Sequence, residues 1–362
     1  MSTVRDVYNY IDEIAPFDTA MDFDNCGMLV GNYSEVINKV LLSLDITPDV
    51  VKEAKKLGAN LIISHHPVIF NPIKRLDSNS VPYLLAKNGI SAICAHTNLD
   101  MADCGVNTAL ADLLGIKDRE GLSVYKSKNY NKVVVFTPID YTDSIKRAMT
   151  LSGAGTLGDY CGCSFQTKGQ GSFLPMEGAK PFLGKVGEYE NVIEDRLEMV
   201  CPKSKTDSVI EAMLKAHPYE VPAYDIFETS AIKEDVCCGI IGNIESEMLP
   251  KDFAQHVKES LNCNGVRYIP GKRKINKVAL CSGAGGDLIY KAVKKGADAF
   301  VTGEIKHHEI LSAMAAGVTV VDAGHFCTED VVIDPLLKII SSKFENIEFV
   351  KSNAYSNMLE YV

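Results

Sequence analysis

Three short apolar runs in the first hundred residues decide the fold: 39–45 (KVLLSLD), 60–64 (NLIIS) and 90–95 (ISAICA). Uninterrupted apolar runs of this length are typical of strands that are buried on both faces, as in a parallel sheet covered by helices. Residues 49–57 and 81–88 have helical spacing and fill the gaps between the runs. The alternation of strand and helix therefore predicts an α/β fold with a mainly parallel sheet.

The same order of residues returns near the C-terminus. Residues 38–42 (NKVLL) correspond to 276–280 (NKVAL), 61–64 (LIIS) to 299–302 (AFVT), and 89–95 (GISAICA) to 317–323 (GVTVVDA). The first two pairings share one offset, and the third differs because one connecting loop is shorter. We infer two related α/β halves, 1–129 and 233–362, that together form one core.

The stretch between the halves, 130–232, has a different character. It begins with a strand at 132–137 (KVVVFT) and continues with a helix from Thr142; the glycine-rich segment 153–171 that follows resembles strands joined by turns. A strand at 198–201, a helix at 206–216 and a strand at 223–227 complete a β-α-β-β-α-β order. This order is the ferredoxin-like plan, so we predict an inserted α+β domain whose ends lie close together.

Composition limits the classes of function. The chain has 362 residues, 46% hydrophobic and 23% charged, as expected for a globular protein of two or three domains. No apolar run is long enough to cross a bilayer, and the N-terminus has no apolar export segment. We therefore expect a cytoplasmic protein with no membrane contact. The net charge of −10, with no basic stripe, disfavours nucleic acid as a partner.

The eleven cysteines are an odd number at irregular spacing. In a cytoplasmic protein we interpret them as reduced thiols that pack as small apolar side chains. Cys161-Gly162-Cys163 and Cys237-Cys238 lack a second pair at zinc-binding spacing, so structural thiols are favoured there too.

Six of the eight histidines stand where a predicted strand ends. In an open α/β sheet, ligands bind outside the carboxyl ends of the strands, so these segments are expected to converge. A single histidine at such a position is more often a hydrogen-bonded rim residue than a metal ligand, but clustering in two related halves favours metal. The segments are His65-His66, His96 to Asp100, Glu304 with His307-His308, and His325 to Glu329.

Imidazole and carboxylate groups together are the ligands of zinc, manganese, iron or nickel. Five side chains suit two ions better than one, and a two-ion site needs a shared ligand, which Asp100 or Glu329 could provide. We predict two divalent ions per chain, with zinc as the first expectation and manganese, iron or nickel as alternatives. The predicted ligands are His65, His66, Asp100, His325 and Glu329.

Two further residues are candidates for proton transfer. His96 is either a residue that orients a ligand or a proton shuttle. Glu304 is either a general base that activates water or a buried carboxylate paired with His307 or His308. The segment 282–287 (SGAGGD) follows a predicted strand and precedes a helix, so its amides could hold an anion, although most such turns are only tight connections.

These motifs resemble those of the GTP cyclohydrolase 1 type 2 homolog family, the NIF-three-like proteins. The resemblance covers nearly the whole chain and rests on 64–67 (SHHP), 96–100 (HTNLD), Gly303-Glu304 with His307-His308, and Gly324-His325 with Glu329. Carried over by motif, the family's dimetal ligands fall on the five residues named above. In the long form of the family the insert resembles the PII and CutA proteins, and 217–220 (HPYE) looks like its marker.

The resemblance also implies a homohexameric ring whose metal sites face an internal cavity. Two functions follow as hypotheses. The first is a metal-dependent hydrolase that acts on a small anionic or nucleotide-like substrate, with Glu304 and His96 moving protons. The alternative is a non-enzymatic protein that binds, delivers or senses metal and acts through its PII-like insert.

Overall fold

A computed structural model describes residues 1–360, with every side chain except that of Lys233. The chain divides into two compact units, which are described separately: 1–126 together with 236–362, and 127–235. The domain boundaries expected from the sequence fall at 130 and 232.

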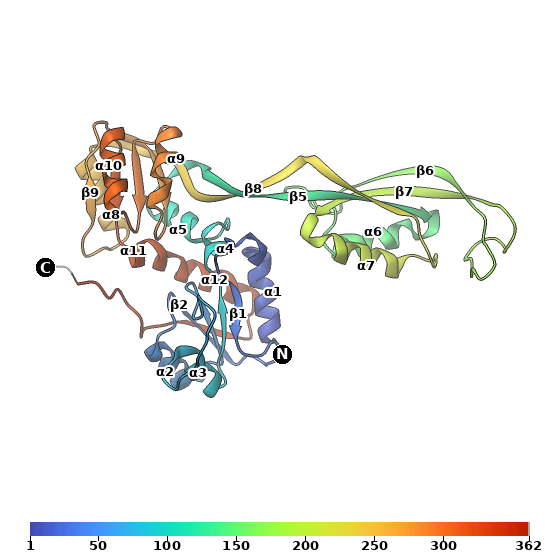
Figure 1. Ribbon diagram of the computed structural model, residues 1–362, viewed down its shortest axis with the longest axis horizontal. Helices are drawn as coiled ribbons and strands as arrows, with labels where there is room; N and C mark the ends of the chain where they lie inside the picture. Colours follow the sequence, from blue (N-terminus) through green and yellow to red (C-terminus); the bar gives the residue numbers. More distant parts are fainter. Residues whose placement is uncertain (361–362) are drawn as a thin grey trace. The chain divides into compact units, whose positions relative to one another are not determined.

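The first unit contains two sheets that are built alike. In the first sheet the strands follow the order β13-β2-β3-β4-β1. The second sheet contains the order β8-β10-β11-β12-β9, so β2, β3 and β4 correspond to β10, β11 and β12 (Figure 1). The strands of the first sheet are β1 (Gly27–Val30), β2 (Lys39–Ser43), β3 (Leu61–Ser64), β4 (Ser91–Cys94) and β13 (Glu348–Lys351). Those of the second are β8 (Tyr224–Met248), β9 (Arg267–Ile269), β10 (Ile275–Cys281), β11 (Ala299–Thr302) and β12 (Thr319–Asp322).

The register of the strands matches the repeat in the sequence. Val40 pairs with Leu61 in the first sheet, as Val278 pairs with Ala299 in the second. Each parallel core also has an antiparallel edge strand that precedes it in the chain, β1 beside β4 and β9 beside β12. The predicted α/β class with two related halves is confirmed.

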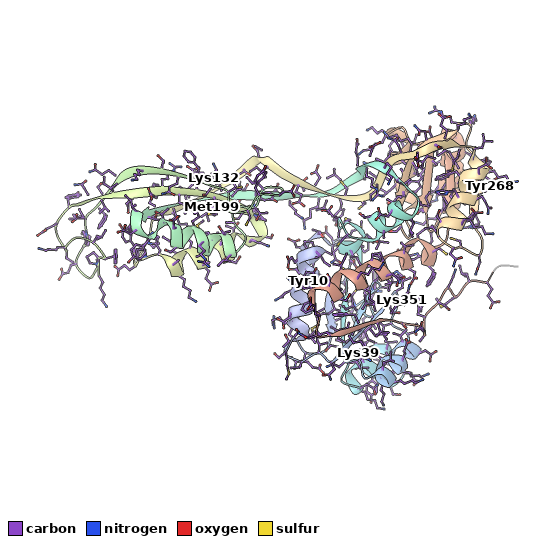
Figure 2. The ribbon with its side chains drawn as sticks, turned by 180° about the vertical axis from the view of Figure 1, so that it is seen from behind. Tyr10, Lys39, Lys132, Met199, Tyr268 and Lys351 are labelled. Carbon is purple, nitrogen blue, oxygen red and sulfur yellow. The ribbon has the colours of Figure 1, made fainter. Side chains whose placement is uncertain are left out.

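One strand of the first sheet was not predicted. β13, near the C-terminus, pairs in parallel with β2, and Lys39 forms an ion pair with Glu348 at 2.8 Å (Figure 2 labels Lys39 and Lys351 on these two strands). The C-terminal segment thus completes the sheet of the N-terminal half.

Helices cover these sheets with their apolar faces. Val4, Val7 and Ile11 of α1 pack with Ile333 and Leu336 of α12 against β2 and β3. The helix α2 begins at the N-cap Thr47, whose side chain accepts the amide of Val50, and ends at Gly58, the predicted C-cap, which has a left-handed backbone. The helices are α1 (Val4–Ile14), α2 (Pro48–Leu57), α3 (Val81–Lys87), α4 (Thr97–Asp100), α5 (Val106–Leu113), α8 (Pro250–Ser260), α9 (Ile289–Lys294), α10 (His307–Ala316), α11 (His325–Glu329) and α12 (Ile333–Lys343).

The second unit has the predicted ferredoxin-like order of elements. Its elements are β5 (Lys117–Pro138), α6 (Thr142–Leu151), β6 (Ser164–Phe173), β7 (Glu190–Pro202), α7 (Thr206–Ala216) and β8. The strands lie in the order β6-β7-β5-β8, with Val133 paired to Met199 (Figure 2 labels Lys132 and Met199). Ile145, Met149, Val209 and Met213 of the two helices cover one face of this sheet.

Two strands of this unit, β5 and β8, are longer than the sequence predicts. A strand was expected to begin at residue 132, but β5 begins at Lys117, and β8 continues to Met248. Residues 117–131 are mostly charged or polar, and only isolated positions such as Leu122 are buried. The alternation of apolar and polar residues that would predict a strand is therefore missing there. None of the helices in the described part of the chain is long and apolar enough to span a membrane.

Candidate metal centre

Three buried elements bring histidines to one place, and each ring is held through its Nδ1 atom. His65 and His66 follow β3 directly. His65 is buried, and its Nδ1 lies 2.9 Å from the carbonyl oxygen of Ala95, so Nδ1 carries the proton. The Nδ1 atom of His66 lies 3.0 Å from Oδ2 of Asp45, the residue reached two positions after β2.

The other two histidines are held by carboxylates in the same way. Nδ1 of His325, the first residue of α11, lies 2.8 Å from Oε1 of Glu304. Nδ1 of His96, the N-cap of α4, lies 2.9 Å from Oδ1 of Asp24. A histidine that ligates a metal usually donates its other ring N–H to a carboxylate or a carbonyl. All four rings have this arrangement, so each has Nε2 available for a ligand.

Glu329 lies at the centre of the cluster. Its Oε2 atom is 2.8 Å from Nε2 of His66, 2.9 Å from Nε2 of His325 and 3.8 Å from Nε2 of His65. The Nε2 atoms of His66 and His325 are themselves 3.3 Å apart. Three imidazole nitrogens therefore face one buried carboxylate oxygen.

The Nε2 atom of His65 is buried and has no hydrogen-bond partner in the described part of the chain. It faces Oδ1 of Asp100 at 3.6 Å, and that oxygen accepts a hydrogen bond from the hydroxyl of Ser282 at 3.2 Å. Because Nδ1 carries the proton, Nε2 presents a lone pair toward two carboxylates. A buried acceptor without a donor is costly, and a cation at this point would satisfy it.

The electrostatics agree with this interpretation. Burial lowers the pKa of His65 to about 4, so this ring is neutral near pH 7. Burial and the charge of Glu329 raise the pKa of Asp100 to about 7. Burial disfavours the charged form of Glu329, yet hydrogen bonds from His325 and His66 outweigh it and hold the pKa of this carboxyl well below its usual range.

His66 and His325 are charged in the metal-free protein. Burial opposes the charge on His66, but hydrogen bonds to Asp45 and Glu329 raise its pKa to about 10. The hydrogen bond to Glu329 raises the pKa of His325 to about 9, against the effect of burial. Protons thus neutralise acidic groups at the centre of the cluster, as a bound cation would.

Two glycines make room for these side chains. A Cβ atom on Gly283, whose φ is +57°, would lie 2.1 Å from Oε1 of Glu329. A Cβ atom on Gly303 would lie 2.6 Å from Oγ1 of Thr328 and 2.9 Å from Cα of His325. The strand ends after β10 and β11 therefore need glycine so that α11 can approach them closely.

In the segment 282–287, three of the amides that could hold an anion donate to internal acceptors. The amide of Ser282 donates to Oδ1 of Asn107 at 2.9 Å, and the amide of Gly283 donates to Oγ1 of Thr328 at 3.1 Å. The amide of Gly285 likewise donates to Oγ1 of Thr302 at 3.1 Å. Because internal acceptors already use these amides, the anion-binding alternative is wrong for them.

The five residues predicted as ligands lie together, and so does His96, whose ring centroid is 5.2 Å from that of His65. His307 and His308 do not join the cluster, so the expected convergence of six histidines is wrong for this pair. They are the first two residues of α10 and are exposed to solvent, and the side chain of Glu309 caps this helix at the amide of Lys306. Glu304 is exposed and pairs with His325, not with His307 or His308.

Sequence reasoning missed Asp45, Asp24 and Gly283. Asp45 stands at the end of the first predicted strand, so the rule that placed the histidines at the carboxyl ends of strands would have found it. Asp24 precedes β1 and binds the amide and hydroxyl of Thr97 as well as His96. No motif marks this aspartate, because only the chain path brings it near α4.

Among residues 1–360, three overlapping groups of side chains have the geometry to hold a metal ion: His66 with His325 and Glu329, His65 with Asp100 and Glu329, and His65 with His66 and His96. In each group the ligand atoms lie within 4.8 Å of one another. Fold and site together define an α/β protein of two related halves with a buried histidine–carboxylate cluster between them.

The chain belongs to the Duf34/NIF3 (NGG1p interacting factor 3) family, which it matches over residues 2–358. It is 38% identical to the Bacillus subtilis protein called GTP cyclohydrolase 1 type 2 homolog, over 89% of this chain and 88% of that protein. It is 35% identical to the Halalkalibacterium halodurans protein of the same name, over 98% of both chains. The predicted family is confirmed.

Solved structures show the same fold. A Bacillus cereus protein related to NIF3 is similar with a TM-score of 0.89 and 36% identity, over 100% of this chain and 99% of that one. A Staphylococcus aureus protein is similar with a TM-score of 0.76 and 30% identity, also over 100% of this chain and 99% of that one.

Proposed function

We propose that this protein binds two divalent metal ions per chain and is a metal-dependent hydrolase of a small anionic or nucleotide-like substrate. The observation that carries the proposal is the common orientation of the four histidines. Each Nδ1 is held by a carboxylate or a carbonyl, and Nε2 of His65 is buried without a donor. Such rings are prepared to bind cations.

Two ions are favoured over one because Glu329 belongs to two of the three candidate groups. His66 and His325 would hold one ion with Glu329, and His65 and Asp100 would hold the other with the same carboxylate. Glu329, rather than Asp100, is then the shared ligand. His96 is the further ring beside His65 and His66, and Asp24 orients it.

Bound divalent ions in such a site supply Lewis acidity and lower the pKa of water. The chain itself provides two groups beside the cluster for moving protons. Glu304 is exposed and hydrogen-bonded to His325, so it can exchange protons with solvent and with a substrate. His96 has one ring nitrogen fixed by Asp24 and the other available to a substrate.

A name shared by relatives suggests a substrate class. The Bacillus subtilis relative is called a GTP cyclohydrolase homolog. We propose a nucleotide-like substrate for this chain on that ground, together with the cationic character that two bound metal ions would give an otherwise acidic protein. We also propose that zinc is the native metal, that the protein is cytoplasmic, and that it assembles as a homohexamer, which light scattering of the purified protein would test.

Metal content tests the centre directly. Mass spectrometry of protein purified without a histidine tag should give about two metals per chain, and both His65→Ala and Glu329→Ala should lose metal while remaining folded by circular dichroism. A well-folded wild-type protein that holds no metal after reconstitution would overturn the proposal.

Turnover then separates hydrolase from metal carrier. With metal restored, wild type should hydrolyse at least one member of a nucleotide and phosphoester panel, and Asp100→Ala should not. Two bound metals without turnover of any compound would favour the alternative, a metal-binding or sensing protein.

A further inference from the structure

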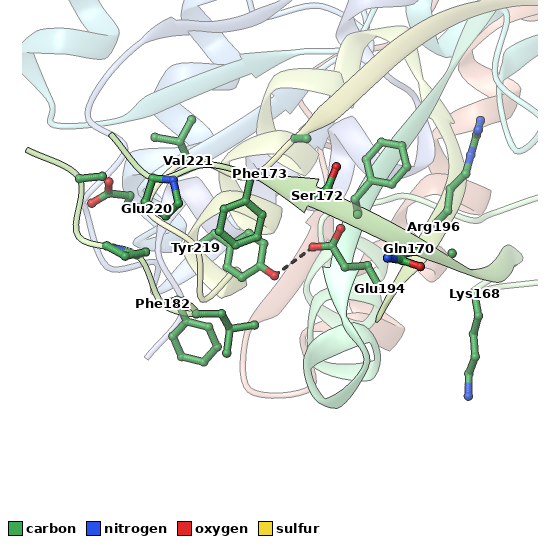
Figure 3. A pocket seen from close by; sticks show the side chains of 18 of the residues that line it. Lys168, Gln170, Ser172, Phe173, Phe182, Glu194, Arg196, Tyr219, Glu220 and Val221 are labelled. Carbon is green, nitrogen blue, oxygen red and sulfur yellow. Dashed lines mark hydrogen bonds between the residues drawn. The ribbon is translucent and has the colours of Figure 1, made fainter. Parts of the chain in front are cut away.

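The second unit contains a cavity of about 520 Å³ that the metal centre does not use. The end of β6, the middle of β7, the loop between them and the segment after α7 form its walls (Figure 3). We call it the insert pocket. A volume of this size suits a small organic ligand. Its aromatic lining residues are Phe136, Phe173, Phe182 and Tyr219.

The aromatic rings form a surface on which a planar molecule can stack. The ring centroids of Phe173 and Tyr219 are 6.1 Å apart, and those of Phe182 and Tyr219 are also 6.1 Å apart (Figure 3). Phe182 lines the pocket and is 47% exposed, so its ring is accessible to a ligand. The ring planes of these two pairs are inclined by 60° and 47°, so a planar ligand can stack on the face of one ring while a neighbouring ring meets it edge-on.

A buried carboxylate lies against this aromatic surface. Glu194 is only 8% exposed, and its Oε1 accepts the hydroxyl proton of Tyr219 at 2.9 Å (Figure 3). In the part of the chain that the structure describes, no lysine, arginine or histidine forms an ion pair with it. A buried charge that has a phenol as its donor is poorly compensated, so a ligand with N–H donors would stabilise it.

The chain holds Tyr219 firmly in place. The ring of His217 is buried, with Nε2 3.0 Å from the carbonyl oxygen of Phe136 and Nδ1 accepting the amide of Tyr219 at 3.1 Å. Burial lowers the pKa of His217, which keeps the ring neutral and able to accept this amide. The sequence 217–220 (HPYE), named above as the marker of the insert, therefore positions a wall of the insert pocket.

On the opposite wall, Oε2 of Glu194 lies against the backbone of Gly171 of β6. A Cβ atom at this position would lie 2.1 Å from the oxygen, so a larger residue there would displace the carboxylate. Two cationic side chains, Lys168 and Arg196, also line the pocket, and Arg196 lies over the ring of Phe136 with Cζ 6.0 Å from its centroid. The acidic side chains of Glu194 and Glu220 line the same pocket, so the cationic and acidic side chains balance in number, which favours a ligand without net charge.

We propose that the insert pocket binds a neutral, planar nitrogen heterocycle that presents adjacent N–H donors to Glu194. The heterocycle stacks on the aromatic surface, and its donor edge meets the carboxylate that Tyr219 orients. Charge-assisted hydrogen bonds to a buried carboxylate are among the strongest in proteins, which makes this edge the determinant of specificity. The inference uses residues of the second unit alone and does not depend on the metal centre.

Calorimetric titration of the full-length, metal-loaded protein tests the proposal, with guanosine as the probe because N1–H and the 2-amino group are adjacent donors. Inosine keeps N1–H but lacks the amino group, and it should bind about tenfold more weakly. Absence of guanosine binding up to millimolar concentration, or equal binding of inosine, would overturn the proposal.

Two variants test the pocket residues. Glu194→Gln keeps an acceptor for Tyr219 but removes the charge, and should weaken guanosine binding about tenfold or more. Glu188→Gln, at an exposed position outside the pocket, should bind as wild type does. Unchanged affinity in Glu194→Gln would contradict the assignment.

Phe182→Ala provides an independent test, because this side chain is half exposed and its loss spares the core. It should also weaken guanosine binding, whereas Tyr189→Ala, at an exposed residue outside the pocket, should not. Metal content should stay unchanged in all four variants, so a failure of this proposal is distinct from a failure of the metal centre. Wild-type affinity in Phe182→Ala would overturn the stacking role.

Discussion

Nε2 of His66 lies 2.8 Å from Oε2 of Glu329, although 263 positions separate the two residues in the chain. His66 lies two residues after β3 of the first half, and Glu329 is the last residue of α11 in the second. The contact therefore forms only when the two related halves pack against each other. Each half contributes an incomplete set of ligands, so neither can form the proposed centre alone.

The carboxylate of Glu329 is expected to be essential for metal binding. Glu329→Gln removes the charge that faces three histidines, and the metal content should fall from about two per chain to below one. Glu345→Gln, at an exposed position outside the cluster, should retain full metal content. Elemental analysis of the two variants side by side decides this, and equal values would exclude Glu329 as a ligand.

Gly283 is expected to be required for the shape of the metal centre. Gly283→Ala places a methyl group 2.1 Å from Oε1 of Glu329 and should abolish metal binding. It should also lower the free energy of unfolding by roughly 1–3 kcal/mol, because the backbone there is left-handed.

Gly296→Ala is the matched control for this glycine. Gly296 has a φ of +78°, but a Cβ atom there has no neighbour within 4 Å. This variant should have a comparable backbone cost and normal metal content. Metal loss in both variants would show that backbone strain, not contact with Glu329, is responsible.

Asp45 is expected to tune the affinity of the centre through His66. Asp45→Asn weakens the acceptor that holds Nδ1, and metal affinity should fall about 10–100-fold without loss of stoichiometry. Competition with a chromogenic chelator measures this. The carboxylate of Asp49 pairs with the exposed Lys52, so Asp49→Asn should leave the affinity unchanged. A wild-type affinity for Asp45→Asn would show that the orientation of His66 needs no carboxylate.

Metal binding should release protons. In the metal-free protein the pKa of His66 is raised to about 10 and that of His325 to about 9, from 6.5, so both rings are charged near neutral pH. A metal must displace these protons, and its apparent affinity should therefore rise with pH until it levels off above about 10. Titration in buffers of different ionisation enthalpy counts the protons, and a count of zero at neutral pH would contradict these pKa values.

The same shifts give the metal-free protein a pH-dependent stability. Because the pKa values of His66 and His325 are raised on folding, their contribution is fully present below pH 6.5 and is lost as the pH rises through about 9 and 10. Denaturation of chelator-treated protein should show a lower unfolding free energy at pH 10 than at pH 6.5. An equal or higher value at pH 10 would contradict this sign.

Much of the fold was predictable because its signals are local. Apolar runs such as 61–64 and 299–302 mark strands wherever they occur, and the repeat between the halves predicts their common register. The lengths of β5 and β8 were not predictable, since their exposed polar residues have no strand pattern. The pairing of β13 with β2 joins the two ends of the chain, and no local signal reports it.

The sequence by itself determined which residue types stand at the carboxyl ends of the parallel strands, because strand period and helix caps are properties of neighbouring residues. It thereby placed His65, His66, Asp100, His325 and Glu329 at one edge. Only the tertiary structure decided that Asp45 and Asp24 hold two of the rings and that Gly283 makes room for Glu329. It also turned His307 and His308 to solvent. Those relationships depend on the angle and separation at which distant elements pack, which no single stretch of sequence contains.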